Sequence, residues 1–306
     1  MPAGGWLARR AGSPGAVGVG EDASVLRSTV RLLDRADLDA ALAVCARDPV
    51  ANAFVAARLL SGGLNPRSGG ELWGYCEGDE LRSLCWAGAN LVPVEATPDA
   101  VEAFAARARR FGRHCSSLVG PADAVLGLWR RLELSWGPAR EVRDQQPLMA
   151  LDGPPLVAPD PAVRRSRLDE LPLVVPACVA MFTEEVGYSP VAADGGAMYQ
   201  AQVTSLVSAG RSFVRMDDGP RGPRVTFKAE LGSVTPAAVQ VQGVWVDPGR
   251  RGEGLALAGM AAVVERVRAE VAPVVSLYVN GFNHRAVHVY EKVGFVQTGT
   301  FATVLF

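Results

Sequence analysis

The stretch of residues 244–256, VWVDPGRRGEGLA, has the residue types and spacing best suited to chemistry. A β-rich run ends here, a turn rich in glycine and arginine follows, and a helix is predicted to begin near Glu253 or Gly254. The free N–H groups of a first helical turn bind anions, because the helix dipole lies behind them. Glycines let the backbone approach a ligand closely, and Arg250 and Arg251 add positive charge. The stretch therefore predicts a pyrophosphate-binding turn.

Two familiar phosphate loops do not fit this turn. The Walker pattern requires Gly-Lys-Ser/Thr, which is absent. The dinucleotide fingerprint requires a third glycine after Gly252 and Gly254, where the sequence has Leu257. The pattern that fits is R-x-x-G-x-A, formed by Arg251, Gly254 and Ala256. Taken alone, this short pattern also fits an ordinary strand-to-helix turn.

A second motif follows about thirty residues later, over residues 283–295. Asn283 is a good residue to begin a helix, and Gly294 is a good residue to end one. Tyr290 shares the apolar face of this helix, so it is predicted to point inward. A tyrosine hydroxyl has an unperturbed pKa near ~10 and stays protonated at neutral pH, so it can act as an acid. A tyrosine that only packs in the core is the alternative.

Together and in this order, the two motifs resemble those of the GCN5-related N-acetyltransferase (GNAT) superfamily. The resemblance covers residues 162–306 and is closest over 239–306. It implies an α/β fold with a mixed sheet flanked by helices. It also implies that strands at 238–246 and 274–279 splay apart to admit acetyl-CoA, whose pantetheine pairs with the free strand edge. On this resemblance, Tyr290 protonates the departing CoA thiolate.

The same resemblance assigns the acetyl-CoA contacts. The backbone of Val244 and Val246 binds the pantetheine arm, the amides of 251–256 hold the pyrophosphate, and Asn283 contacts the cofactor chain. The implied cofactor-binding residues are Val244, Trp245, Val246, Arg251, Gly252, Glu253, Gly254, Leu255, Ala256 and Asn283.

The general base is less well defined. Many family members carry a carboxylate on the long central strand, where this chain has Gln240 and Gln242, which do not take a proton at neutral pH. The candidates are Glu184 or Glu185, in the region that lines acceptor pockets in the superfamily, and Glu230 on the preceding strand. A water relay, or loss of catalysis, would also account for the missing carboxylate.

The chain length of 306 residues favours two domains. Residues 1–27 are interpreted as a disordered tail, and the proline-rich stretch 152–161 as a linker. The block 28–151 is predicted to repeat the element order of 162–306, which suggests a second, degenerate GNAT-like domain. An unrelated α/β domain is the alternative.

Two stretches near the block ends are predicted to be β-structure. Residues 140–151 are expected to form one or two strands, and residues 295–306 a terminal strand pair.

The N-terminal block resembles an uncharacterised domain that precedes acetyltransferase domains in proteins of some high-GC bacteria. The segments DPVANAFVAARL (48–59) and ELWGY (71–75) carry this resemblance. The block has no R-x-x-G-x-G/A turn, so it is not expected to bind CoA in the same way. Trp73, Trp86 and Trp129 either cover the acceptor entrance or pack in the core.

Composition narrows the possible partners. The net charge of −1 offers no basic field for nucleic acid or an anionic membrane. No apolar run reaches the ~18 residues of a membrane span, no secretory signal is evident, and the five cysteines form no C-x-x-C pair. These features favour a cytoplasmic protein. His284 and His288 have helical i, i+4 spacing but no third ligand nearby, so no metal is expected.

The sequence therefore predicts an enzyme that transfers the acetyl group of acetyl-CoA to a primary amine. The acceptor would be a small molecule, a peptide or a protein lysine. One alternative is a non-catalytic acyl-CoA-binding or interaction module. Another is a tandem GNAT enzyme of the mycothiol-synthase type, in which one half can be inactive. No particular oligomeric state is predicted.

Overall fold

The computed structural model describes residues 28–65, 69–191, 196–220 and 222–306, so the predicted tail at 1–27 lies outside the described residues. We refer to residues 28–151 as the N-terminal half and to 152–306 as the C-terminal half. The elements of the N-terminal half are β1 (Ser28–Leu32), α1 (Leu38–Cys45), α2 (Ala53–Gly62), β2 (Gly70–Glu77), β3 (Glu80–Gly88), β4 (Asn90–Val94), α3 (Pro98–Phe111), β5 (Ser117–Pro121), α4 (Ala122–Trp136) and β6 (Glu141–Leu151). Those of the C-terminal half are β7 (Arg164–Arg165), α5 (Leu171–Val186), α6 (Ala197–Ser208), β8 (Ser212–Gly219), β9 (Gly222–Val234), β10 (Ala238–Val246), α7 (Leu255–Glu270), β11 (Val274–Tyr278), α8 (His284–Val293) and β12 (Val296–Leu305).

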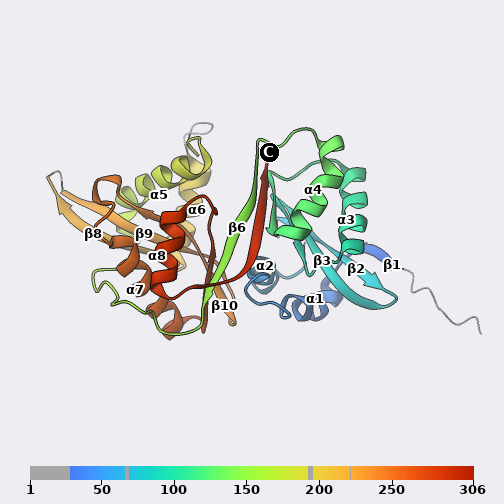
Figure 1. Cartoon of the computed structure of the whole chain (residues 1–306), viewed down its shortest axis with the longest axis horizontal. Helices are drawn as coiled ribbons and strands as arrows, with labels where there is room; N and C mark the ends of the chain where they lie inside the picture. The colour runs from blue at the N-terminus through green and yellow to red at the C-terminus, as the bar shows by residue number, and fades with distance from the viewer. Residues whose placement is uncertain (1–27, 66–68, 192–195, 221) are drawn as a thin grey trace, which may run out of the picture.

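The described strands join into one mixed sheet in the order β1-β2-β3-β4-β5-β12-β6-β11-β10-β9-β8-β7. At its centre the two halves exchange their last strands. Strand β12 of the C-terminal half pairs with β5 and β6, and β6 of the N-terminal half pairs with β11 and β12. Figure 1 shows β6 and the red C-terminal strand side by side between the two groups of helices. The domain boundary near 152–161 stays a prediction. In space, each half of the chain adds a strand to the part of the sheet that the other half forms.

This exchange corrects the expectation of a terminal strand pair at 295–306. The segment is a single strand, β12. Its neighbours are β5 and β6, which occupy both of its edges. No hairpin partner is needed within the segment, because the partners come from a part of the chain more than 140 residues away.

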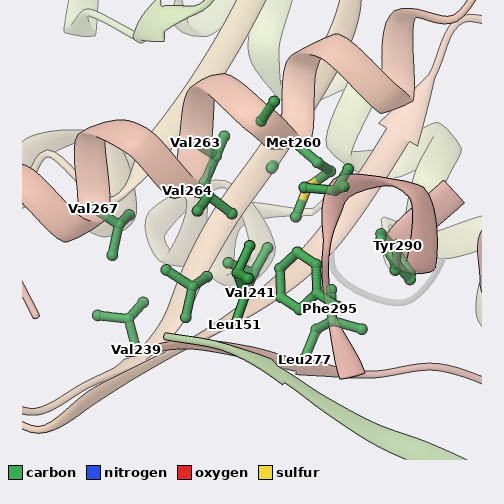
Figure 2. Packing of buried hydrophobic residues seen from close by; sticks show 14 of the residues in the cluster. Leu151, Val239, Val241, Met260, Val263, Val264, Val267, Leu277, Tyr290 and Phe295 are labelled. Carbon is green, nitrogen blue, oxygen red and sulfur yellow. The ribbon is translucent and has the colours of Figure 1, made fainter. Parts of the chain in front are cut away.

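One large apolar cluster lies between α7, α8 and the sheet of the C-terminal half. Met260, Val264 and Val267 of α7 are fully buried against Val239 and Val241 of β10 (Figure 2). These α7 positions recur every three to four residues, as the sequence pattern predicts. Burial of each such side chain stabilises the fold by roughly 1.5–3 kcal/mol.

The exchanged strands contribute to the core of the opposite half. Met149 and Leu151 of β6 lie in the cluster under α7 and α8. Ala302 and Val304 of β12 lie in the cluster formed by α3 and α4. Each half therefore buries apolar side chains of the other and depends on it for a complete core.

Strands β10 and β11 part after a short parallel ladder. They are paired only where Ala238–Gln240 face Val274–Ser276. Beyond that point β10 continues along β9, while β11 continues along β6. We call this opening the fork.

A bulge in β10 accompanies the fork. The register between β10 and β9 shifts between Gln242 and Trp245, and Gly243 has a φ of +60°. Val241 faces α7 before the bulge, and Val244 packs against the same cluster after it. An extra residue in one strand reverses the alternation of side chains, which explains this change of parity.

A buried ion pair lies against the bulge. The Lys228 ammonium, with no exposed side-chain surface, is 2.8 Å from the Glu230 carboxylate and donates a 2.9 Å hydrogen bond to the carbonyl of Gly243. A Cβ at Gly243 would lie 3.0 Å from Glu230 and 3.1 Å from Lys228. The sulfur of Cys178 donates to the same carboxylate at 3.2 Å. The pair thus satisfies a carbonyl that the bulge removes from the β-ladder.

The strand exchange makes a prediction about a cut chain. A protease site inserted after Gly153, between β6 and the next element, allows the two halves to be separated covalently. We expect the cut fragments to co-elute on size exclusion and to unfold in one transition, because each fragment contributes a strand to the part of the sheet formed by the other fragment. Fragments that separate as two folded monomers would contradict the exchange.

The buried pair makes a second prediction. Lys228→Met leaves the Glu230 carboxylate buried without its cation, so we expect the free energy of unfolding to fall by about 3–5 kcal/mol in urea titrations. Replacing both residues by apolar ones should recover much of this loss. Lys292→Met is the control, because Lys292 is exposed on α8 and its loss should change stability by no more than about 0.5 kcal/mol. A Lys228→Met protein with the wild-type midpoint would refute this account of the bulge.

Candidate functional site

The glycine-rich turn lies directly after β10, at the fork. The Asp247 carboxylate accepts a 2.8 Å hydrogen bond from the N–H of Gly249 and so fixes the first part of the turn. Gly252 and Gly254 have φ values of +92° and +80°. Only glycine adopts such angles without strain, which is why the sequence has glycine here.

Helix α7 begins at Leu255, one or two residues after the predicted start. No side chain caps it, and residues 251–254 are exposed. The N–H groups of its first turn therefore face outward without a protein acceptor from a capping side chain, and the positive end of a 16-residue helix lies behind them. This geometry suits a phosphate or pyrophosphate group.

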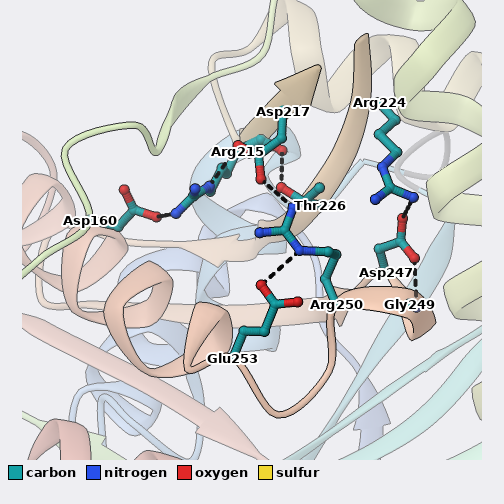
Figure 3. A network of polar contacts seen from close by, with 9 residues as sticks. All are labelled: Asp160, Arg215, Asp217, Arg224, Thr226, Asp247, Gly249, Arg250 and Glu253. Atoms are coloured by element: carbon teal, nitrogen blue, oxygen red, sulfur yellow. Dashed lines mark hydrogen bonds and ion pairs between the residues drawn. The ribbon is translucent and has the colours of Figure 1, made fainter. Parts of the chain in front are cut away.

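Arg250 is held in an ion-pair network beside the turn (Figure 3). Its guanidinium lies 2.9 Å from Asp217 and 2.7 Å from Glu253. Asp217 also pairs with Arg215, which reaches Asp160 at 2.7 Å. The adjacent arginines hold the pKa of Asp217 below its usual range, although burial acts in the opposite direction. The network ties the turn to β8 and to the segment that follows β6.

Arg251 bridges the turn and the end of α5. Its Nη2 is 2.6 Å from the Glu184 carboxylate, and its Nε donates to the carbonyl of Val246 at 3.1 Å. The other oxygen of Glu184 accepts a 3.2 Å hydrogen bond from the indole of Trp245. Glu184 thus connects two residues expected to contact the cofactor.

Tyr290 points inward from α8, as its helical position predicts. Its ring packs edge-on against Phe295, with ring centres 6.0 Å apart. Among the described residues, no hydrogen-bond partner of its hydroxyl is present. Burial, together with the negative charge of Glu185, raises the pKa of Tyr290 above its ordinary value, so the phenol is protonated at neutral pH.

Glu185 is the centre of a polar network that spans both halves. Its carboxylate accepts hydrogen bonds from Arg143 at 2.7 Å and Asn280 at 2.8 Å. Asn280 in turn accepts from Gln146 at 2.8 Å, and Gln146 accepts from Thr303 at 2.7 Å. Arg143 and Gln146 belong to the exchanged strand β6. The same carboxylate also raises the pKa of Tyr278 at the end of β11, after the larger effect of burial.

The structure places the remaining predicted residues as follows. Glu230 lies on β9 and is paired with Lys228 of the same strand, and only 7% of the Glu230 side chain is exposed. Gln240 is buried and Gln242 is exposed on β10. The Asn283 side chain accepts a 3.2 Å hydrogen bond from Ala286 and so caps α8, as its sequence position predicts.

The sequence reasoning missed four residues of this site. They are Arg143, Gln146, Asn280 and Lys228. The first three meet only because β6 enters the C-terminal half of the sheet, and no local pattern indicates that exchange. For Lys228 a signal was available, namely a lysine within a β-rich run. A charge on a buried strand requires a partner.

The helix start that corresponds to α7 in the N-terminal half is that of α3, and it differs from the start of α7. Between β4 and α3, the Thr97 side chain accepts from the N–H of Ala100, and Pro98 occupies the first turn of the helix. The helix start is thus capped by its own chain.

The described residues contain no cluster of three or more residues suited to a metal ion. None of their helices is long and apolar enough to cross a membrane.

Comparisons with known proteins agree with this geometry. Residues 215–295 match the family described as "Acetyltransferase (GNAT) family", and residues 70–174 match "Domain of unknown function (DUF4081)". No curated protein matches the chain.

Solved structures share the fold over most of the chain. A GCN5-related N-acetyltransferase from Sphaerobacter thermophilus has a TM-score of 0.58 at 16% identity, covering 91% of this chain and 95% of that one. A tandem GNAT protein from the clavulanic acid biosynthesis pathway has a TM-score of 0.55 at 13% identity, covering 91% and 98%. A GNAT-family acetyltransferase from Colwellia psychrerythraea has a TM-score of 0.54 at 10% identity, covering 91% and 99%. At these identities the likeness concerns the fold.

The sequence match at residues 215–295 falls on the strands, turn and helices that form the fork. The chain therefore carries an N-acetyltransferase domain of the GNAT family in its C-terminal half, joined through exchanged strands to an N-terminal half of similar α/β architecture.

Proposed function

We propose that the C-terminal half transfers the acetyl group of acetyl-CoA to a primary amine. The observation that carries this proposal is the combination of the fork with the uncapped start of α7. The fork leaves the edge of β10 near Val244 and Val246 without a β11 partner. An extended pantetheine arm can add to such an edge as a further strand does. The pyrophosphate then meets the amides of residues 251–256, at the positive end of α7.

Tyr290 is the proposed acid for the leaving thiolate. Amine attack on the thioester forms the C–N bond and breaks the C–S bond; the nitrogen gives up a proton to water, and the departing sulfur takes one from Tyr290. The phenol of Tyr290 is protonated at neutral pH and its hydroxyl has no protein hydrogen bond among the described residues. A free donor of this kind can turn to the sulfur without breaking another interaction.

Glu185 is the proposed contact for the acceptor amine. Glu184 is paired with Arg251, and Glu230 is paired with Lys228 in the interior. The interior pairing of Glu230 opposes a role in taking a proton from substrate, whereas Glu184 is 44% exposed and stays a candidate beside Glu185. The Glu185 carboxylate is half exposed and lies close enough to Tyr290 to raise its pKa. It can hold an amine at the mouth of the fork, directly or through water.

The acceptor class follows from the same surroundings. Arg143 already neutralises Glu185, so the site presents little net charge to the acceptor. A primary amine on a small molecule, a peptide or a protein lysine fits this chemistry. The proposal includes no metal, because direct attack on a thioester requires none.

The role of Tyr290 is tested by Tyr290→Phe. We expect kcat to fall by about 10²-fold or more with a panel of primary amines, because the acid is lost. The dissociation constant for acetyl-CoA and the thermal midpoint should stay close to wild type, since the hydroxyl has no protein partner to lose. Thiol release and calorimetry measure these quantities.

Tyr75→Phe is the matched control, because Tyr75 is a buried tyrosine of the N-terminal half. It should leave kcat unchanged. If wild type binds acetyl-CoA but no amine gives turnover above that of Tyr290→Phe, the chain is a non-catalytic acyl-CoA-binding module and the enzymatic proposal fails.

The phosphate-binding turn is tested by Gly254→Ala. At a φ of +80°, the added Cβ strains the backbone by roughly 1–2 kcal/mol, although it meets no atom within 4 Å. Relief of that strain would move the amides, so we expect the affinity for CoA to fall about tenfold in calorimetry. Gly153→Ala is the control, because Gly153 has open space and no positive φ. Equal CoA affinity in Gly254→Ala and wild type would exclude this turn as the binding site.

A further inference from the structure

The two carboxylates at the end of α5 differ in how many of their oxygens are occupied. Both oxygens of Glu184 accept a hydrogen bond, one from an indole and one from a guanidinium. Both donors to Glu185, namely Arg143 and Asn280, reach the same atom, Oε1, at 2.7 and 2.8 Å. Among the described residues, no donor reaches the Oε2 of Glu185, whose side chain is half exposed. Glu185 therefore has one fixed oxygen and one oxygen available to a ligand.

Three neutral side chains connect this carboxylate to the centre of the sheet. The Gln146 amide donates a 2.8 Å hydrogen bond to the Oδ1 of Asn280, and the Thr303 hydroxyl donates a 2.7 Å hydrogen bond to the Oε1 of Gln146. All three side chains are buried. Gln146 belongs to β6 and Thr303 to β12, the two exchanged strands. We call Thr303, Gln146 and Asn280 the amide relay.

The end of the amide relay at Glu185 sets the direction of each of its hydrogen bonds. A carboxylate paired with an arginine only accepts, so Asn280 must turn its NH₂ group to Glu185 and its oxygen to Gln146. Gln146 must then donate with its own NH₂ group, which leaves its oxygen to accept from Thr303. The amide of Asn280 is thus held in one of its two possible orientations.

Arg143, the second donor to the Oε1 of Glu185, is itself fixed. Its Nε and Nη2 donate to the carboxylate of Glu141 at 2.8 and 3.1 Å, and its Nη2 also donates to the backbone carbonyl of Glu185 at 2.8 Å. Only 11% of the Arg143 side chain is exposed. Two immobilised donors on one oxygen restrict rotation of the Glu185 carboxylate.

We propose that Gln146 is a positioning residue for the acceptor amine. It fixes the amide of Asn280, and Asn280 with Arg143 holds the Oε1 of Glu185, so that the Oε2 accepts a hydrogen bond from an N–H of the amine. Gln146 is buried and acts through Asn280. This role rests on the proposed acetyl transfer, and it makes acceptor recognition depend on a strand of the N-terminal half.

Gln146→Met keeps the length of the side chain and removes both hydrogen bonds of its amide. The test uses butylamine, 2-phenylethylamine and lysine amide as acceptors. We expect the KM for the best of these amines to rise about tenfold, because the Asn280 amide is no longer held in one orientation. The kcat and the dissociation constant for acetyl-CoA should stay within about twofold of wild type, since neither the acid nor the turn is changed. Gln145→Met is the matched control, because it makes the same change at the exposed neighbouring position and should leave all three quantities unchanged.

Thr303 tests the far end of the amide relay, and it serves if Gln146→Met fails to fold. Thr303→Val keeps the shape of the side chain and removes the hydroxyl, so the amine KM should rise by a smaller factor, about threefold. Thr303→Ser keeps the hydroxyl and should restore the wild-type KM. Wild-type KM values in both Gln146→Met and Thr303→Val would overturn the proposal. Parallel losses of kcat, acetyl-CoA affinity and thermal midpoint would overturn it as well, because they indicate a merely structural role.

A measurement without substrate separates the amide relay from the proposed function. Glu185→Gln lets the end of the relay donate as well as accept, so we expect the side-chain NH₂ signals of Gln146 to shift in ¹⁵N–¹H spectra, two hydrogen bonds away. Glu184→Gln, at the neighbouring carboxylate outside the relay, should leave these signals in place. If wild type acetylates no amine, the proposed function fails and these spectra still decide whether the relay exists. Unchanged Gln146 signals in Glu185→Gln would overturn the relay even in an active enzyme.

Discussion

The hydrogen bond from the buried Lys228 ammonium to the carbonyl of Gly243 is the contact on which the C-terminal site depends. A regular strand would continue to pair on both edges, and β10 would then offer no free edge to a ligand. The pairing of β10 with β11 ends at Gln240, and the bulge that follows at Gly243 leaves a carbonyl that needs a new donor. Lys228 supplies that donor, and Glu230 supplies the charge that makes a buried ammonium tolerable. The bulge thus lies between the point where β10 and β11 part and the glycine-rich turn that precedes α7.

The strand exchange gives the N-terminal half a place in the candidate site, although the start of its helix α3 is capped by its own chain. Strand β6 brings Arg143 and Gln146 to the network around Glu185 and Asn280, at the side of the fork where Tyr290 lies. A network of this kind fixes side chains from α5, β6 and the end of β11 relative to one another. The proposed acceptor side is therefore built by both halves, whereas the proposed cofactor side is built by the C-terminal half alone.

The sequence predicted those features that depend on local chemistry. The turn at 251–254, the caps of α8 at Asn283 and Gly294, and the inward face of Tyr290 all follow from residues within a few positions of one another. The exchange of β6 and β12 could not be predicted in this way. The alternation of a strand indicates which face is buried but carries no information about the partner, so a terminal strand pair was predicted for residues 295–306, where the structure has one strand. Asn280 and Arg143 were missed for the same reason, because their meeting depends on the pairing of distant strands.

The two arginines of the turn contribute in a different way from the one that their positive charges suggest. Arg250 is paired with Asp217 and Glu253, and Arg251 with Glu184, so most of their charge is already balanced. The groups left to attract an anion are the backbone amides at the start of α7, which need no rearrangement to receive it. The ion pairs hold those amides in place, since they tie the turn to β8 and α5. Because a preformed site avoids the ordering cost that a flexible loop incurs on binding, the arginines would support the proposed anion binding mainly through the order they impose on the turn.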